Sequence, residues 1–154
     1  MSKIEFNETT HEYKVANKVY ISTTQLMKKY GLSPDYGGIP AAVLAKASQK
    51  GNAVHKALEE FILGNTSVSS LFKEVELFEN YCKMRNLVVT DMIPEQVVFD
   101  QNYEVAGTLD LQYIDGQDGI IADFKTTSTL HMEAIAWQLS IYNYLVCKGD
   151  MIEY

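Results

Sequence analysis

Residues 105–125 read VAGTLDLQYIDGQDGIIADFK, and this stretch decides the fold. Apolar and polar residues alternate on either side of a glycine-rich centre, which is the pattern of two half-buried strands. The connection DGQDG at residues 115–119 is a strong hairpin signal. We therefore predict strands over residues 105–113 and 119–125 that pair in an antiparallel hairpin.

Acidic residues gather on one face of this predicted hairpin. Side chains two apart on a strand share a face, so Asp123 and Lys125 project together while Phe124 points into the core. Pairing through the turn can put Asp110 beside Asp123 on the same surface. Glu95, near the start of the preceding predicted strand, can join them.

Such a cluster has a definite chemistry. Converging carboxylates repel each other unless a cation or a proton settles the site. Hard oxygen ligands suit Mg²⁺ or Mn²⁺, and a nearby lysine can orient water or stabilise the charge that builds on a phosphate. This set is suited to metal-assisted phosphodiester hydrolysis. An isolated Asp-x-Lys is more often a surface ion pair on an edge strand, so the motif alone leaves both interpretations open.

The rest of the chain carries short strand signals first, then helices, then strands and a last helix. The further predicted strands cover residues 3–7, 11–15, 18–21 and 94–100, and the predicted helices cover residues 23–30, 40–49, 52–63, 68–86 and 131–148. A mainly helical part over residues 1–90 therefore precedes antiparallel strands and a helix over residues 91–154. This order predicts one α+β domain over residues 1–154.

The charge is unevenly distributed along the chain. Eight lysines and six acidic residues give +2 over residues 1–64, whereas five basic and fourteen acidic residues give −9 over residues 65–154. Acidity does not attract phosphate by itself, but a bound divalent ion would reverse the local field. The charge thus disfavours a passive DNA-coating protein and is compatible with a metal enzyme.

Composition also argues against membrane and secreted classes. No stretch approaches the roughly 18–20 consecutive apolar residues of a membrane span, and residues 1–13 lack an apolar signal region. Cys82 and Cys147 stand far apart in no metal-type spacing, which favours idle thiols in a reducing compartment. We therefore expect a cytoplasmic protein with no membrane partner.

Several motifs occur in a fixed order along the chain. They are KGNAVHKALEEF (residues 50–61), PEQVVFD (94–100), AGTLDLQY (106–113), IADFKTTS (121–128) and WQLSIYNYL (137–145). With this ordered set the chain resembles the PD-(D/E)xK nuclease superfamily, and within it the RecB-like exonuclease group with its phage and prophage members. Residues 11–31 also look like the lead-in of phage-encoded members, so the resemblance covers nearly the whole chain.

The resemblance implies a fold and an activity. The expected fold is a restriction-endonuclease-like core, mostly antiparallel strands flanked by helices. The expected activity is a Mg²⁺- or Mn²⁺-dependent deoxyribonuclease that acts on linear duplex or single-stranded DNA, in recombination, repair or processing in a bacterial host cell. A recombination partner protein and a homo-oligomer are left open. The alternative is a nuclease-like module that no longer cuts and binds DNA or protein, or inhibits; another is an unrelated acidic interaction protein.

The resemblance also implies roles around the metal. Asp110 and Asp123 would bind the ion directly, and the carbonyl of Phe124 would complete its coordination. Lys125 would be the catalytic lysine. Glu95 matches the acidic residue of the first core strand, which reaches a metal-bound water or a second ion.

Five further residues extend the candidate site. His55 matches the helix histidine that RecB-like enzymes add as a metal ligand, although a lone histidine on an amphipathic helix is more often structural. Gln138 and Tyr142 share a helix face and match the group's substrate-contacting motif; by themselves they are ordinary half-buried residues. Thr126 and Thr127 are candidates for hydrogen bonds to a phosphate, or simply end the strand.

Two features depart from the family pattern. Some RecB-like nucleases hold an iron–sulfur cluster with four cysteines, and the two cysteines here exclude that cluster. The family usually adds one or two strands after the helix at residues 137–145, where this sequence has only a short segment. We therefore expect a RecB-like core without an iron–sulfur cluster. A piece of a longer protein, an unusually small member, or a homo-oligomer that completes the sheet would each account for the short segment after the helix.

Overall fold

The computed structural model describes residues 4–7, 9–148 and 150–151. The chain divides into two compact units. Unit 1 consists of Met1–Asp35, Val97–Leu109 and His131–Tyr154, and unit 2 consists of Tyr36–Gln96 and Asp110–Leu130. The prediction of a single domain over residues 1–154 stays a prediction.

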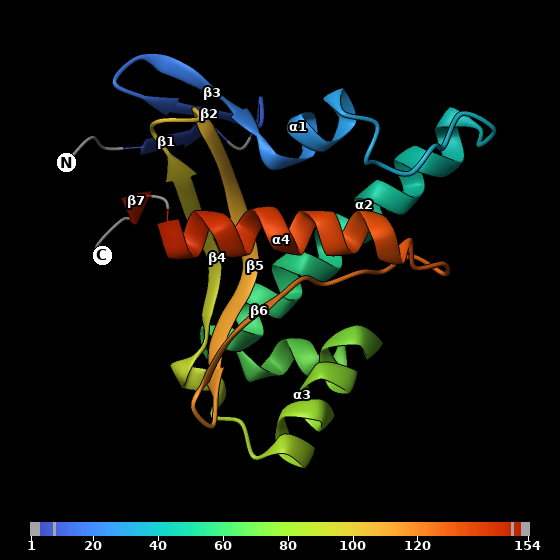
Figure 1. The fold of residues 1–154 in the computed structure, drawn as a ribbon. Helices are drawn as coiled ribbons and strands as arrows, with labels where there is room; N and C mark the ends of the chain where they lie inside the picture. Colours follow the sequence, from blue (N-terminus) through green and yellow to red (C-terminus); the bar gives the residue numbers. More distant parts are fainter. Residues whose placement is uncertain (1–3, 8, 149, 152–154) are drawn as a thin grey trace. The chain divides into compact units, whose positions relative to one another are not determined.

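The described residues form four α-helices and seven strands, so the predicted α+β class is confirmed (Figure 1). In chain order the elements are β1 (Ile4–Asn7), β2 (Glu12–Val15), β3 (Lys18–Ser22), α1 (Thr23–Lys29), α2 (Ala41–Ile62), the 3₁₀ helix η1 (Thr66–Ser70), α3 (Lys73–Arg85), the 3₁₀ helix η2 (Val89–Asp91), β4 (Ile93–Asp100), β5 (Val105–Asp115), β6 (Asp118–Ala122), α4 (Met132–Lys148) and β7 (Asp150–Met151). Strands β4 and β5 each have residues in both units.

The sheet of unit 1 is mixed. Its strands follow the order β1-β2-β3-β5-β4-β7. The pairs β1–β2, β2–β3 and β4–β7 are antiparallel, whereas β3 runs parallel to β5, with Ile21 opposite Val105. The core of this unit is made of Ile4, Tyr13, Val15, Tyr20, Phe99 and Ala106.

Two helices of unit 1 meet over a glycine. Ser22 caps α1 through a reciprocal pair of hydrogen bonds with Gln25, and α1 packs against α4. A Cβ atom placed on Gly107 of β5 would lie 2.6 Å from both Thr23 Oγ1 and Tyr142 Cε1. Only a glycine therefore lets Thr23 of α1 and Tyr142 of α4 come this close to the strand.

Unit 2 is built on the β5–β6 hairpin and two helices. Leu111 of β5 pairs with Ala122 of β6 in an antiparallel ladder. Helix α2 packs against η1 and α3. The buried core consists of Val54, Ala57, Leu58, Phe61, Ile62, Val68, Val75, Cys82, Met92, Leu111 and Tyr113. Cys147, the other cysteine, is exposed in unit 1.

Two helix predictions differ from the structure. The sequence predicts helices over residues 40–49 and 52–63, whereas α2 is continuous through Gly51. The buried face of its second half outweighs the roughly 0.5–1 kcal/mol that a helical glycine costs. The helix predicted over residues 68–86 begins only at Lys73, because residues 66–70 form a 3₁₀ turn in which Ser69 and Ser70 bond back to main-chain carbonyls.

Among the described residues, no helix has both the length and the apolar character needed to cross a membrane.

Candidate metal centre

The β5–β6 hairpin of unit 2 positions two carboxylates. Because Leu111 pairs with Ala122, Asp110 and Asp123 occupy the next step along the same register. The prediction that the second strand reaches residue 125 is wrong, since β6 ends at Ala122. Instead of continuing the ladder, the N–H of Phe124 donates a 2.7 Å hydrogen bond to Asp110 Oδ2. This bond ties the segment after β6 to the side chain of β5.

His55 reaches the same segment from α2. It follows Val54, which is buried in the core of unit 2. Its Nε2–H donates a 2.9 Å hydrogen bond to the carbonyl oxygen of Phe124, and its Nδ1 lies 3.6 Å from Asp110 Oδ2. The imidazole also packs edge-on against the ring of Phe124, with centroids 6.1 Å apart. The histidine that the sequence predicted as a ligand thus lies beside the predicted carboxylate and carbonyl.

Glu95 joins this group through an unusual backbone conformation. Its φ of 49° is in the left-handed region, which non-glycine residues rarely adopt inside a strand. One side-chain donor atom each of His55, Glu95 and Asp110 lie within 4.8 Å of one another. A left-handed residue costs of order 1–3 kcal/mol and persists only where its surroundings hold it. Backbone strain therefore occurs at the residue that brings the third donor atom to the cluster.

Asp123 and Lys125 form an ion pair next to this group. Lys125 Nζ lies 2.5 Å from Asp123 Oδ2, and the aspartate side chain is only 5% exposed. Asp123 Oδ2 accepts no hydrogen bond within the described part of the chain. The charge of this buried carboxylate is balanced by the ammonium group of Lys125.

The pKa of Asp110 is shifted by its burial and by the charged groups around it. Burial, and then the negative charge of Asp123, raise the pKa of Asp110 from 3.8 to about 6, against the opposing influence of His55, the Phe124 N–H and Lys125. With its Nε2–H directed to the Phe124 carbonyl, His55 turns its Nδ1 toward the Asp110 carboxylate. The carboxylates of Asp110 and Asp123 repel each other unless a proton or a cation lies nearby.

The donor set fits a divalent cation. One imidazole nitrogen, several carboxylate oxygens and a main-chain carbonyl match the preferences of Mg²⁺ and Mn²⁺. The residues present could therefore hold such an ion after small adjustments of the side chains.

Two predicted substrate-binding threonines follow the lysine in unit 2. Thr126 lies against α2, where its Oγ1 would be 3.4 Å from a Cβ atom on Gly51. Thr127 is exposed, and its hydroxyl donates to the carbonyl of Thr129 at 3.0 Å. Thr126 thus has a packing role, while Thr127 shapes the loop after the site.

The other two predicted substrate-binding residues, Gln138 and Tyr142, belong to α4 of unit 1. Gln138 is half-buried. Tyr142 is buried and packs over Gly107. The structure thus brings His55, Glu95, Asp110 and residues 123–125 together in unit 2, and gives Tyr142 a packing role in unit 1.

Two features of the site were not predicted from the sequence. The main-chain N–H of Phe124 serves as a hydrogen-bond donor to Asp110, and Glu95 is left-handed. Pro94 carried a signal for the second, because proline within a strand marks an edge, an end or a bulge. No pattern in the sequence indicated the first, since it depends on where β6 stops.

No family model, curated protein or solved structure matches this chain.

Proposed function

We propose that this chain is a Mg²⁺- or Mn²⁺-dependent deoxyribonuclease of the PD-(D/E)xK type, with a restriction-endonuclease-like core. One observation carries the proposal: donor atoms of His55, Glu95 and Asp110 converge within 4.8 Å. The Asp123–Lys125 ion pair follows on the segment that Asp110 holds. A surface ion pair requires no such gathering of half-buried acids and a histidine, so the arrangement favours a site over a chance Asp-x-Lys.

Each residue of the site has a distinct task in this proposal. A divalent cation bound here would supply a Lewis acid for the phosphodiester and make water more acidic. Asp110, Asp123 and Glu95 would supply the negative charge that holds the ion, and His55 and the Phe124 carbonyl would be its other ligands. The 2.7 Å bond from the Phe124 N–H keeps the Asp110 carboxylate in one orientation.

In this proposal Lys125 stabilises the transition state of phosphodiester hydrolysis. Its side chain is 30% exposed while its ammonium group contacts the buried Asp123. It can therefore stay anchored and still donate hydrogen bonds to a phosphate that reaches the site from solvent. Charge builds on the phosphate oxygens during hydrolysis, and a fixed cation beside them lowers the barrier.

DNA is the proposed substrate, as linear duplex or as single strands. The support is the ordered set of motifs that resembles RecB-like phage and prophage nucleases. The same resemblance supports a role in recombination, repair or processing of DNA in the cytoplasm of a bacterial host.

The proposal is tested by Mn²⁺ titration calorimetry together with digestion of linear, closed-circular and single-stranded DNA. Asp110→Ala should abolish detectable Mn²⁺ binding and slow cleavage at least about 100-fold. Asp118→Ala is the matched control, because Asp118 is an exposed carboxylate at the start of β6 in the same hairpin. Equal cleavage by the Asp110→Ala variant and the unchanged chain would refute the proposal. Mn²⁺ binding without cleavage of any DNA would favour the inactive nuclease-like module.

A further inference from the structure

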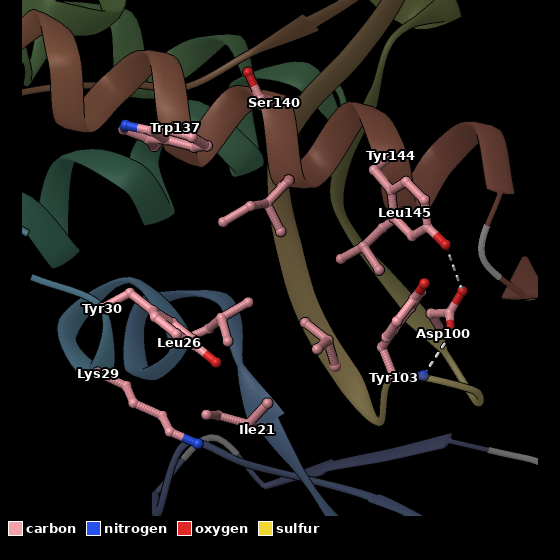
Figure 2. A pocket seen from close by; sticks show the side chains of 12 residues that line it. Ile21, Leu26, Lys29, Tyr30, Asp100, Tyr103, Trp137, Ser140, Tyr144 and Leu145 are labelled. Atoms are coloured by element: carbon pink, nitrogen blue, oxygen red, sulfur yellow. Dashed lines mark hydrogen bonds between the residues drawn. The ribbon is translucent and has the colours of Figure 1, made fainter. Parts of the chain in front are cut away.

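Unit 1 contains a cavity of about 570 Å³ (Figure 2). It is lined by residues of α1, α4, β3 and β5 and of the turn between β4 and β5. Its aliphatic lining is formed by Ile21, Leu26, Val105, Ile141 and Leu145. The volume is within the range of about 300–1,000 Å³ that is usual for small-ligand sites.

Four exposed aromatic side chains surround this lining. They are Tyr30, Tyr103, Trp137 and Tyr144, with exposed fractions between 41% and 70%. Figure 2 shows Tyr30 and Trp137 toward one end of the cavity, and Tyr103 and Tyr144 toward the other. Single exposed aromatics are common, but several that converge on one cavity mark a binding surface.

The second aromatic pair is held in place by a buried carboxylate. Asp100 is 2% exposed, and its Oδ1 accepts 2.8 Å hydrogen bonds from the main-chain N–H groups of Asn102 and Tyr103. Its Oδ2 lies 3.5 Å from the hydroxyl of Tyr144, the weakest of these contacts. The rings of Tyr103 and Tyr144 meet edge-on, with centroids 6.0 Å apart. Asp100 thus preorganises this end of the cavity.

A cation and several polar groups complete the rim. Lys29 Nζ lies 5.8 Å from the centre of the Tyr30 ring. The tyrosines carry hydroxyl groups and Trp137 carries an indole N–H. The Ser140 hydroxyl donates to the Ala136 carbonyl of its own helix at 2.7 Å and points away from the cavity (Figure 2). A ligand that matches this rim has flat apolar faces, polar edges and a negative charge nearby.

We propose that this cavity binds bases of single-stranded DNA by stacking on the aromatic rings, with Lys29 meeting an adjoining phosphate. The choice of nucleic acid as ligand rests on the proposed nuclease function. Nucleobases have flat faces and polar edges, and they stack on aromatic side chains with little dependence on sequence. Interior bases of a duplex do not expose their faces, so the site selects unpaired strands. A purely aliphatic ligand would leave the polar rim unused.

The single tryptophan makes this proposal measurable. Trp137 is the only tryptophan of the chain and lines the cavity, so its fluorescence reports what binds there. The titrant is a ten-nucleotide oligothymidylate in EDTA, where no metal-dependent hydrolysis occurs, with fluorescence anisotropy of the labelled oligonucleotide as a second signal. We expect quenching of Trp137, and at least tenfold weaker binding of an abasic oligonucleotide of equal length. Equal affinity for the two would overturn the proposal, because binding would then use the backbone alone.

Variants test the individual rings. Tyr103→Ala should weaken oligothymidylate binding about tenfold or more, and Tyr103→Phe should retain it, since stacking needs the ring and not the hydroxyl. Tyr81→Ala is the matched control, because Tyr81 is an exposed tyrosine of α3 in unit 2. Unchanged affinity in Tyr103→Ala would overturn the proposal. So would quenching by an apolar peptide but not by the oligonucleotide, which would indicate a protein ligand.

Failure of this inference can be told apart from failure of the proposed function. Asp110→Ala should lose cleavage and keep oligothymidylate binding. If the unchanged chain binds the oligonucleotide at Trp137 but cuts no DNA in Mn²⁺, the nuclease proposal fails and the stacking site stands. If the chain cuts DNA but Trp137 and Tyr103 do not respond to the oligonucleotide, the stacking site fails alone.

Discussion

His55 Nε2 lies 2.9 Å from the carbonyl oxygen of Phe124, to which it donates a hydrogen bond. This contact joins α2 to the segment that follows β6, across 69 positions of sequence. It directs the other ring nitrogen toward Asp110. This hydrogen bond therefore fixes the orientation of the imidazole before a metal ion binds. Metal-binding histidines are commonly oriented in this way, by a hydrogen bond from the ring nitrogen that does not face the metal.

The role of His55 can be tested by its removal. His55→Ala should lower the affinity for Mn²⁺ by about 10–100-fold, because both a ligand and the group that orients Phe124 are lost. Titration calorimetry measures the change. His131→Ala is the control, since His131 is an exposed histidine that precedes α4 in unit 1. An unchanged affinity in His55→Ala would assign the histidine a packing role only.

Asp110 is expected to destabilise the metal-free protein at neutral pH. Its folded pKa of about 6 is above the ordinary value of 3.8. The folded state therefore holds the proton more tightly than the unfolded state, and this stabilisation is complete below pH 3.8 and is lost as the pH rises through 6. Asp110→Asn should raise the free energy of unfolding by about 1–3 kcal/mol at pH 7.5 in EDTA, with little effect near pH 4.

Urea unfolding at the two pH values measures this difference. The same experiment with Mn²⁺ at pH 7.5 provides the control, because bound metal should stabilise the unchanged chain and not the Asp110→Asn variant. A variant that is less stable than the unchanged chain at pH 7.5 in EDTA would contradict the assigned burial and charge of Asp110.

The hairpin of unit 2 shows which structural features the sequence predicts and which it does not. The alternation in residues 105–125 predicts both strands and their turn, and the pairing of Leu111 with Ala122 puts Asp110 and Asp123 at neighbouring positions as expected. The sequence does not predict that β6 stops at Ala122. That end depends on the Phe124 N–H, which bonds to a side chain instead of the ladder.

The candidate metal centre likewise has features that the sequence predicts and features that it does not. Residue types and motif order place His55, Glu95 and Asp110 on one candidate list, and the fold brings their donor atoms together. Local patterns do not encode the left-handed conformation of Glu95, because long-range packing imposes it against the residue's own preference. The helix break predicted at Gly51 failed for a related reason, since burial of one face of α2 outweighs local propensity.

The strain at Glu95 gives a second stability test. Glu95→Gly and Glu95→Ala both remove the carboxylate and should weaken Mn²⁺ binding equally. They should differ in stability, because glycine adopts a φ of 49° without steric cost whereas alanine does not. We expect the glycine variant to be more stable than the alanine variant by about 1 kcal/mol in urea unfolding. Equal stabilities would place Glu95 in an unstrained conformation.

Two glycine substitutions should have opposite effects on stability. Gly51→Ala should stabilise the protein by about 0.5–1 kcal/mol, because α2 gains helix propensity and the nearest neighbour, Thr126 Oγ1 at 3.4 Å, can rotate. Gly107→Ala should destabilise it by about 1–3 kcal/mol or more, because its Cβ would lie 2.6 Å from both Thr23 and Tyr142. Thermal unfolding checks both, and a shift of the same sign in the two variants would contradict the packing described for one of them.

The most direct test of the metal-dependent nuclease is the rate of DNA hydrolysis by Lys125→Ala in Mn²⁺. Lys83→Ala is the matched control, because Lys83 forms an ion pair with Glu79 on α3 without belonging to the site. We expect Lys125→Ala to bind Mn²⁺ within a few-fold of the unchanged chain but to cleave DNA at least about 100-fold more slowly, while Lys83→Ala cleaves DNA normally. Equal rates of cleavage by Lys125→Ala and the unchanged chain would contradict it.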